Sequence, residues 1–499
     1  MSSPVPAVPV HRRRLFKDIL QGSGIYLFGF IAQRFAGVLM IPITTRCLTT
    51  ADFGIADLLE QTTSVLSLLL GARFGSALGY FYFEKDSDER RRSIVGTSLV
   101  GATLLGLLAL LITRPFATPI ARLVFRDAAA GRYLALVLLL LPLSFLSEAA
   151  YSLLRVENRP VAYTLMSSFR LILQMAGTIV FVALLKLRVL GLCYSSIVAT
   201  ILVTGALAVH CVRRFGAQFE WRTFVRMMKY AMPLGFAGIA MFFVNVGDRF
   251  ILPHYRSLGD LGIYVLAYKI GMMLAFVYGS FHTYWSAQVF PIMRREDADH
   301  VFARTFTYVM AGISFCAIFL VVCSPPALRI MVAPAFRSAT GLVPLIVAAY
   351  YFRAIGDFVR CLFLVENRPG YDAVCNWVGA VICGAGYLLL IPKYGIWGAA
   401  YATLAAFLLL AVVSIVWTHH LRPYRVEAAR LLKVGAAAAA AFVPYFALGH
   451  ATLAVSIVSA TLSLVLFPMA LWVLRFPTPG EWTLALAAAG RLQAKFLKG

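Results

Sequence analysis

Apolar residues in this chain come in long blocks that are separated by short polar segments. A typical block holds about 20 residues, the length of a helix that spans a hydrocarbon layer of about 30 Å. The pattern predicts an all-α polytopic membrane protein with about fourteen transmembrane helices. The predicted spans cover residues 22–45, 55–82, 93–113, 133–154, 161–185, 190–210, 231–253, 262–290, 303–323, 342–365, 371–392, 396–418, 434–450 and 452–474.

Composition supports this class. The 499 residues are 61% hydrophobic and only 13% charged, and the mean hydropathy is +0.82. A soluble protein of this length needs more polar surface. The first apolar block is too long for a signal-peptide core and no small-residue cleavage site follows it, so we expect it to remain as a helix.

The net charge of +23 is concentrated in short loops. Lys and Arg are most frequent in the N-terminal tail, the loops after even-numbered helices and the C-terminal tail. The positive-inside rule therefore places both termini in the cytoplasm. It also explains the basic balance better than a nucleic-acid partner, which we do not expect.

An internal repeat divides the chain. Val-Glu-Asn-Arg-Pro occurs at 156–160 and again at 365–369, an offset of 209. Other pairs match at nearly the same offset: Asp52-Phe53-Gly54-Ile55 with Asp260-Leu261-Gly262-Ile263, Gly71 with Gly279, Gly191 and Tyr194 with Gly398 and Tyr401, and Gly24 with Gly235.

Each copy of the repeat holds six helices, so both copies enter the membrane from the same side. This predicts two six-helix lobes related by an axis along the membrane normal, a plan common among transporters. We predict an N-lobe over 1–211, a C-lobe over 212–420, and two extra helices with a basic cytoplasmic tail over 421–499.

The repeated pentapeptide ends helices 4 and 10 on the cytoplasmic side. Pro160 and Pro369 suit the first turn of the following helices. One interpretation is a tight turn with an interfacial anchor. The other is a paired basic rim at a cytoplasmic entrance, made by Arg159 and Arg368. The sequence leaves both open.

Charged residues within the spans are functional candidates because each costs several kcal/mol in lipid. The basic ones are Arg34, Arg73, Arg170, Arg249, Lys269, Arg353 and Arg360, and the embedded acids are Glu60, Glu148, Asp248 and Asp357. Arg353, Asp357 and Arg360 share one helical face, which allows structural pairing. Glu148 and Asp357 lie nine residues before the glutamates of the two pentapeptides.

We interpret the four acids as charge-pairing or ion-coupling candidates. Helices 1, 2, 7 and 8 could flank a central cleft, and the cationic side chains there would suit a phosphate-bearing substrate. The predicted substrate-binding residues are Arg34, Arg73, Arg249, Lys269 and Arg353.

Sequence motifs of nucleotide-binding and catalytic sites are missing. The sequence holds no GxxxxGK[ST], GxSxG or HExxH, and its eight cysteines form no CxxC pair. No loop has room for a catalytic domain. We therefore expect neither an enzyme nor a metal or other cofactor.

Two stretches resemble a known family. RCLTTADFGIADLLEQTTSVLSLLLGARFGSAL, at 46–78, and DRFILPHYRSLGDLGIYVLAYKIG, at 248–271, are similar to the helix 1–2 and helix 7–8 regions of polysaccharide-biosynthesis flippases. These flippases belong to the multidrug/oligosaccharidyl-lipid/polysaccharide exporter (MOP) superfamily.

The resemblance implies two lobes that open alternately to each side. It implies movement of an undecaprenyl-diphosphate-linked oligosaccharide across a bacterial inner membrane, for O-antigen, capsule or exopolysaccharide synthesis, with a polysaccharide polymerase and chain-length machinery as partners. Cation-coupled drug antiporters are the alternative, although they generally have twelve helices and often an acid in helix 1, where this chain has Gln33-Arg34. Lipid II flippases share the fourteen-helix count.

Overall fold

The computed structural model describes residues 36–71, 74–84, 87–449 and 452–477. These residues form helices with short connections, and there is no strand among them. The all-α class predicted from the sequence is confirmed. By internal contacts the chain divides into two compact units, residues 1–262 and residues 263–499.

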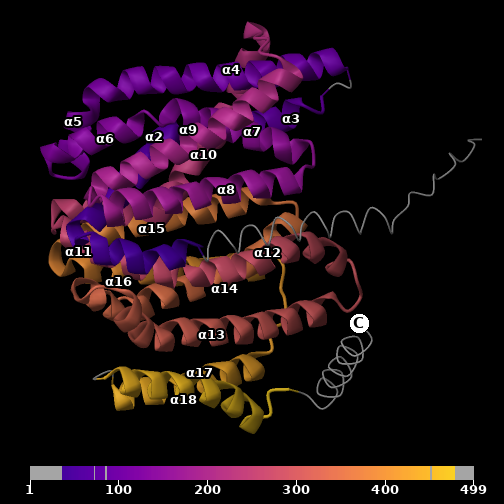
Figure 1. Ribbon diagram of the computed structural model, residues 1–499. Coiled ribbons are helices and arrows are strands. Elements are labelled where there is room, and N and C mark those ends of the chain that lie inside the picture. The colour runs from indigo at the N-terminus through magenta and orange to yellow at the C-terminus, as the bar shows by residue number, and fades with distance from the viewer. Residues whose placement is uncertain (1–35, 72–73, 85–86, 450–451, 478–499) are drawn as a thin grey trace, which may run out of the picture. The chain divides into compact units, whose positions relative to one another are not determined.

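Unit 1 is a set of helices of which the long ones run side by side (Figure 1). A short helix, Ala36–Cys47, comes first. It is followed by α2 (Thr50–Gly71), α3 (Phe74–Phe81), α4 (Asp88–Thr113), α5 (Ala117–Val124), α6 (Gly131–Leu138), α7 (Leu141–Val156), α8 (Pro160–Thr178) with a π-helical end η3 (Ile179–Leu184), α9 (Arg188–Phe215) and α10 (Trp221–Ile251).

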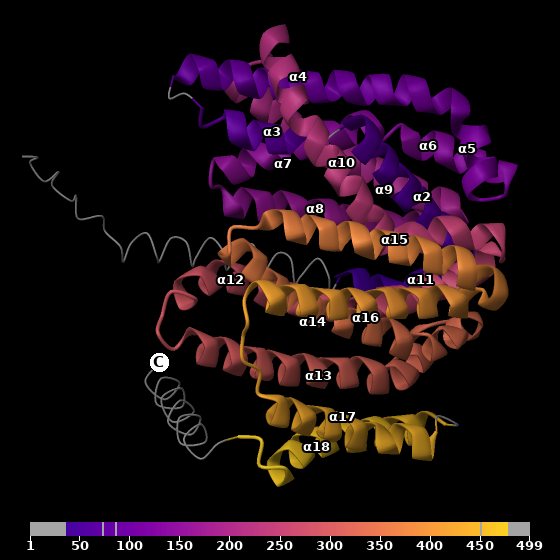
Figure 2. The same cartoon turned by 180° about the vertical axis from the view of Figure 1, so that it is seen from behind.

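Unit 2 is again helical, and Figure 2 shows it from the other side. Its first helix, α11 (Leu258–Gly271), begins in the last residues of unit 1. The others are α12 (Met273–Ile292), α13 (Ala298–Met331), the 3-10 helix η5 (Pro334–Gly341), α14 (Val343–Val365), α15 (Pro369–Tyr394), α16 (Ile396–Leu421), α17 (Ala428–Leu448) and α18 (Leu453–Val473).

Among the described residues, ten helices are long and apolar enough to cross a membrane, or up to twelve if each bent pair is one span. The predicted count of fourteen is therefore not confirmed. The first predicted span lies mostly outside the described residues, and α10, at the place of helix 7, is not among the candidates. The two-lobe repeat over 1–211 and 212–420 also stays a prediction.

One predicted helix is divided, and another begins at a bend. The span 133–154 is divided between α6 and α7, which meet at 41°, and η5 enters α14 at 45°. Pro142 and Pro344 stand in the first turn of α7 and α14, where proline favours the start of a new helix over continuation of the old one.

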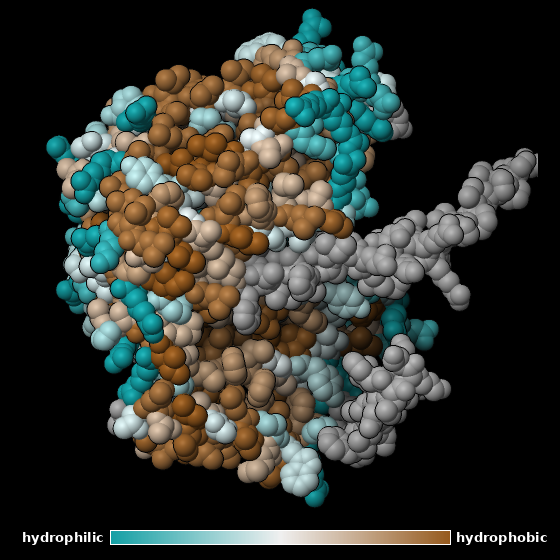
Figure 3. Space-filling model, viewed as in Figure 1, coloured by the Kyte–Doolittle hydropathy of each residue, from teal (hydrophilic) through white to brown (hydrophobic). Residues whose placement is uncertain are grey.

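The surface has the polarity of a membrane protein. In Figure 3, hydrophobic side chains cover the middle of the helices, and hydrophilic side chains gather at their ends. Large apolar side chains such as Leu111, Leu184 and Phe446 are 71%, 70% and 77% exposed. Such exposure is unfavourable in water but not in lipid, so the chain is a multi-pass membrane protein.

The two copies of the pentapeptide have the same local structure. Asn158 and Asn367 adopt the left-handed region, with φ of 53° and 55°, which asparagine tolerates better than most residues. The next backbone N–H, of Arg159 or Arg368, donates to a carbonyl five residues back, at 2.9 and 2.8 Å. Pro160 then begins α8 in the same way that Pro369 begins α15.

The glutamates of the pentapeptides bind matched partners as well. Glu157 lies 3.1 Å from Arg214 at the end of α9, and Glu366 lies 2.7 Å from Arg422, directly after α16. Each pentapeptide therefore forms a tight turn and binds it to the end of a neighbouring helix, α9 for the first copy and α16 for the second. These contacts favour the structural interpretation of the motif.

The starts of α2 and α11 form another matched pair. Thr49 and Asp52 bond reciprocally, the Thr hydroxyl donating to the carboxylate at 2.8 Å. Ser257 and Asp260 do the same at 2.9 Å. These are capping arrangements that satisfy free N–H groups of a first helical turn.

Glycines let the same two helix starts approach closely. A methyl group on Gly54 would lie 2.3 Å from the carbonyl oxygen of Leu258, and one on Gly262 would lie 1.9 Å from that of Thr50. Gly54 corresponds to Gly262 and Thr50 to Leu258 at the repeat offset of 208, so the contact is reciprocal. All four residues belong to unit 1.

A second pair of glycines lies in the first turns of α9 and α16. A methyl group on Gly191 would stand 2.8 Å from the carbonyl oxygen of Phe181, and one on Gly398 would stand 2.1 Å from that of Leu390. Real Cβ atoms do not approach backbone so closely. The sequence anchor Gly191–Gly398 therefore marks a packing requirement shared by two hairpins.

We expect Gly398→Ala to lower the free energy of unfolding by about 1–3 kcal/mol, the usual cost of overpacking. Gly384→Ala on α15 is the matched control, because no atom lies within 4 Å of its new methyl group. A thiol-reactive dye can follow thermal unfolding in detergent, since Cys193, Cys211 and Cys361 are buried. Equal midpoints for the two variants would contradict the packing argument.

Candidate functional site

A buried ion pair joins α2 to α10. Nη1 of Arg249 lies 2.9 Å from both carboxylate oxygens of Asp57, and the two side chains are only 5% and 2% exposed. The backbone N–H of Arg249 donates to Oδ1 of the fully buried Asp248, at 2.8 Å. Charges at this depth are stable only in pairs.

Arg249 therefore has a carboxylate partner that the sequence did not reveal. Asp57 lies 192 positions away, and no local spacing connects the two. An anion that binds Arg249 would have to compete with Asp57. A role for Arg249 in substrate binding, and one for Asp248 in ion coupling, stay predictions.

Three other candidates are exposed although they lie well inside apolar helices. Glu60 is on α2, Glu148 on α7 and Lys269 on α11. Glu60 and Lys269 stand near the middle of the candidate spans Thr50–Gly71 and Leu258–Ser286. A charged side chain at the centre of a bilayer costs about 3 kcal/mol or more. These positions are more stable if they face water than if they face lipid.

A polar cluster in unit 2 connects α14 to α15. Asp357 pairs with Arg360 and lies 3.6 Å from Nε of Arg353. Arg360 also reaches Asn376 at 2.8 Å and Asp372 at 3.4 Å. The two arginines and two aspartates neutralise one another, which is the structural pairing that the sequence left open.

The remaining candidate residues belong to the pentapeptide turns or lie outside the described part of the chain. Arg159 and Arg368 are exposed at the pentapeptide turns, and Arg159 lies 3.3 Å from Glu157 of its own motif. Arg34 and Arg73 lie outside the described residues. Within the part of the chain that is described, no group of three or more His, Cys, Asp or Glu could hold a metal ion.

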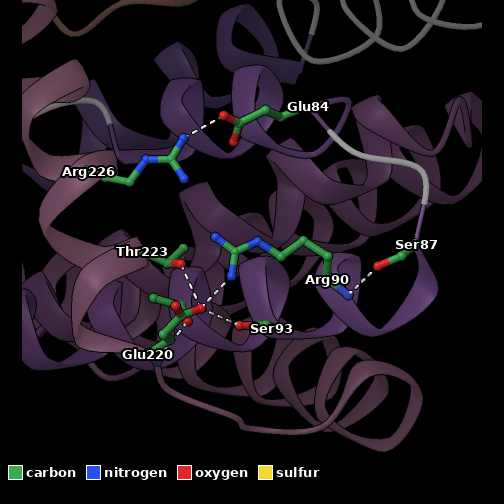
Figure 4. A network of polar contacts seen from close by, with 8 residues as sticks. Glu84, Ser87, Arg90, Ser93, Glu220, Thr223 and Arg226 are labelled. Carbon is green, nitrogen blue, oxygen red and sulfur yellow. Dashed lines mark hydrogen bonds and ion pairs between the residues drawn. The ribbon is translucent and has the colours of Figure 1, made fainter.

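A second network, missed by the sequence reasoning, fastens the start of α4 to the start of α10 (Figure 4). One oxygen of Glu220 accepts from Arg90 at 2.7 Å, from Ser93 at 3.0 Å and from Thr223 at 2.7 Å. The backbone N–H of Glu220 donates to the hydroxyl of Thr97 at 3.0 Å. We call this set the α4–α10 clamp.

A second ion pair lies beside the clamp. Arg226 of α10 binds Glu84, which follows α3 (Figure 4). In the clamp the acid belongs to the α10 side, whereas in this pair the acid belongs to the α3–α4 side. The two pairs therefore hold the first turns of α10 against the α3–α4 connection from both directions.

The clamp depends on an ionised carboxylate. The hydrogen bond from Thr223 lowers the pKa of Glu220 most, and those from Ser93 and Arg90 lower it further, while partial burial raises it. Because the pKa of this acid is lower in the folded state, its contribution to stability is present above the unfolded pKa. That contribution is lost as pH falls through the folded pKa.

Removal of one partner from the pair in α2 and α10 should be costly. We expect Asp57→Ala to lower the free energy of unfolding by about 3–5 kcal/mol, because Arg249 would lose its bound carboxylate in a buried site. Glu60→Gln, three residues along the same helix but exposed, should change it by less than about 0.5 kcal/mol. Thermal unfolding in detergent measures both, and a small loss for Asp57→Ala would refute the pairing.

Acid should loosen the α4–α10 clamp. As pH falls from roughly 5 to 3, across and below the usual range for Glu, we expect amide hydrogen exchange to rise at the start of α10 faster than intrinsic exchange explains. Glu220→Gln should show the raised exchange already at neutral pH and little further change with acid. Identical pH profiles for the two proteins would rule out this role of the carboxylate.

Solved structures of transporters share this fold. The lipid II flippase MurJ in an inward closed conformation matches with a TM-score of 0.73 and 15% identity, over 90% of this chain and 98% of that chain. An inward-facing multidrug resistance MATE transporter of the MOP superfamily matches with a TM-score of 0.64 and 14% identity, over 78% and 94%. A MOP superfamily transporter from Pyrococcus furiosus gives 0.57 and 14%, over 81% and 95%.

At these identities the likeness shows the fold alone, which is a MOP-type transporter fold. A search of curated proteins gave no match. The family model for polysaccharide biosynthesis proteins matches residues 19–296, more than half of the chain. This chain is therefore a member of the polysaccharide biosynthesis protein family.

Proposed function

We propose that this protein is a flippase for an undecaprenyl-diphosphate-linked oligosaccharide. It moves the lipid-linked glycan across a bacterial inner membrane by alternating access, with both termini in the cytoplasm. The product serves the synthesis of O-antigen, capsule or exopolysaccharide, and a polysaccharide polymerase with its chain-length machinery is the expected recipient. The family match and the transporter fold support this proposal.

One observation carries the proposal. Charged side chains stand exposed near the middle of apolar helices in both units, as Glu60 does on α2 and Lys269 on α11. Lipid tails offer such groups no solvation, whereas a hydrated passage does. A passage that can be hydrated at this depth suits a substrate with a polar head and an apolar tail.

Cationic groups on such a passage favour an anionic substrate. Lys269 offers a point charge that matches a diphosphate oxygen. Arg34 and Arg73, which lie outside the described residues, would add bidentate donors. The exposed acids Glu60 and Glu148 are the candidates for coupling to an ion gradient, because either can exchange a proton or a cation with water.

A glycosyltransferase or polymerase is the enzymatic alternative. It would need a sizeable polar domain to hold sugar nucleotides or to join glycans, and the described connections between helices are short. A lipid II flippase and a cation-coupled drug antiporter are the alternatives within the same fold. They differ from the proposal only in substrate, so transport assays separate them.

Reconstitution in liposomes tests the function. We expect the protein to move a fluorescent polyprenyl-diphosphate trisaccharide between leaflets faster than empty liposomes do, with no lengthening of the glycan. Lys269→Ala should slow exchange about tenfold, equivalent to about 1.4 kcal/mol. Lys269→Arg should retain most of the rate, because it keeps the charge.

Lys393→Ala is the matched control, since this lysine is also exposed but lies in the last turn of α15. Exchange no faster than in empty liposomes would count against the flippase proposal. Exchange of lipid II alone would instead identify a lipid II flippase. Efflux of lipophilic cations would identify a drug antiporter.

A further inference from the structure

Two tyrosines form an exposed stacked pair at the end of unit 1 where α4 and α10 begin. Tyr80 of α3 and Tyr230 of α10 have ring centroids 4.7 Å apart and planes inclined by 18°. Tyr80 is 57% exposed and Tyr230 is 38% exposed. Stacking does not conceal these rings, so a broad aromatic surface remains open to solvent or to a ligand.

The pair is held in place from behind. The ring of the buried Phe81 stands nearly perpendicular to both tyrosine rings, at 87° and 76°. Edge-to-face contacts of this kind are favourable and orient the rings. Among the described residues, neither tyrosine hydroxyl forms a hydrogen bond within the chain. The surface is therefore preformed, and no described group occupies its two hydroxyls.

A half-exposed ion pair borders the same surface. Arg226 lies one helical turn before Tyr230 on α10, and Glu84 lies one turn after Tyr80. The two side chains bind each other while they remain 47% and 35% exposed. The guanidinium of Arg226 also stands 5.0 Å from the centre of the Phe81 ring, which fixes it beside the tyrosines. Donor and acceptor groups thus line the rim of an aromatic face.

This combination matches the chemistry of a sugar ring. A pyranose presents a face of C–H groups, which the negative face of an aromatic ring attracts. Around that face lies a rim of hydroxyls that need both donors and acceptors. We propose that Tyr80, Tyr230, Glu84 and Arg226 form a subsite that binds a sugar ring of the substrate glycan. This inference rests on the proposed function and names a part of its site.

A lipid headgroup suits the surface less well. Tyrosines are common at membrane interfaces, but Arg226 is already paired with Glu84, and that carboxylate would repel an anionic phosphate. Tyr255 and Tyr394 are exposed by 49% and 56% at other helix ends. No aromatic ring of the described residues stacks on either of them, as expected of simple interfacial anchors. Under the proposed topology the stacked pair faces the cytoplasm, where the glycan is loaded.

Binding measurements in detergent test the subsite. The probes are a fluorescent short-chain polyprenyl diphosphate without sugar and the same lipid bearing a gluco-, galacto- or manno-configured trisaccharide. We expect wild-type protein to bind at least one glycan probe more tightly than the bare lipid. Tyr80→Ala and Tyr230→Ala should each weaken glycan-probe binding about tenfold and leave the bare lipid unchanged.

Tyr80→Phe should keep most of the affinity, because it keeps the stacking ring. Trp221→Ala is the matched control, since Trp221 is 66% exposed at the start of the same helix but does not belong to the stacked pair. Equal losses for both kinds of probe, or losses shared by Trp221→Ala, would mark the tyrosines as lipid anchors and overturn the inference. Unchanged glycan binding in both tyrosine variants would overturn it as well.

The same experiment separates the two levels of the proposal. If wild-type protein binds both kinds of probe and the tyrosine variants match it, only the sugar subsite fails and the flippase proposal stands. If wild-type protein binds neither kind of probe and moves no glycan-bearing lipid in liposomes, the flippase proposal fails and the subsite with it.

Discussion

The ion pair between Asp57 and Arg249 is the contact on which the arrangement of unit 1 depends. Two full charges with almost no exposure are stable in the fold only while they touch. A turn earlier on α2, Asp52 binds Arg188 of α9 at 2.8 Å, and Gly54 packs against the start of α11. Thus α9, α10 and the start of α11 are all fixed to a short stretch of α2.

The contacts of α2 restrict which motions are possible in the transport cycle we propose. By the sequence repeat, α2 belongs to the first copy and α10 to the second. If the copies rotate against each other, the Asp57–Arg249 pair must either break in each cycle or mark the pivot. Breaking a buried pair costs about 3–5 kcal/mol unless new partners form. A pivot near these residues requires no such cost, and motion would then be largest at the helix ends far from the pair.

The sequence predicted the elements better than their connections. The apolar blocks located most of the helices, and the repeated pentapeptide located two turns whose backbone and ion pairs match. These features depend on local chemistry: proline starts a helix, asparagine tolerates the left-handed region, and glycine permits close approach. The break within the span 133–154 was missed, because hydrophobicity continues across a bend that packing produces.

Long-range polar contacts were harder to foresee. Asp57 is part of a motif that the sequence analysis quoted, yet its partner lies 192 positions away. Glu220 and Arg90 are 130 positions apart. A single sequence gives spacing along one helix, so it identified the Arg353–Asp357–Arg360 face but not the aspartate and asparagine that complete it from α15. Partners across helices follow from tertiary packing, which periodicity does not encode.

The positions of paired and exposed charges suggest how one protein could handle a substrate with two unlike ends. Buried charges bind one another and hold helices together. In the proposed function, the exposed Glu60, Glu148 and Lys269 meet water and a diphosphate. At the end of unit 1, the tyrosine pair offers an apolar face with a polar rim, which a sugar ring needs and a phosphate does not. A lipid-linked glycan would meet these two environments with its two polar parts, and neither environment alone would select for the whole molecule.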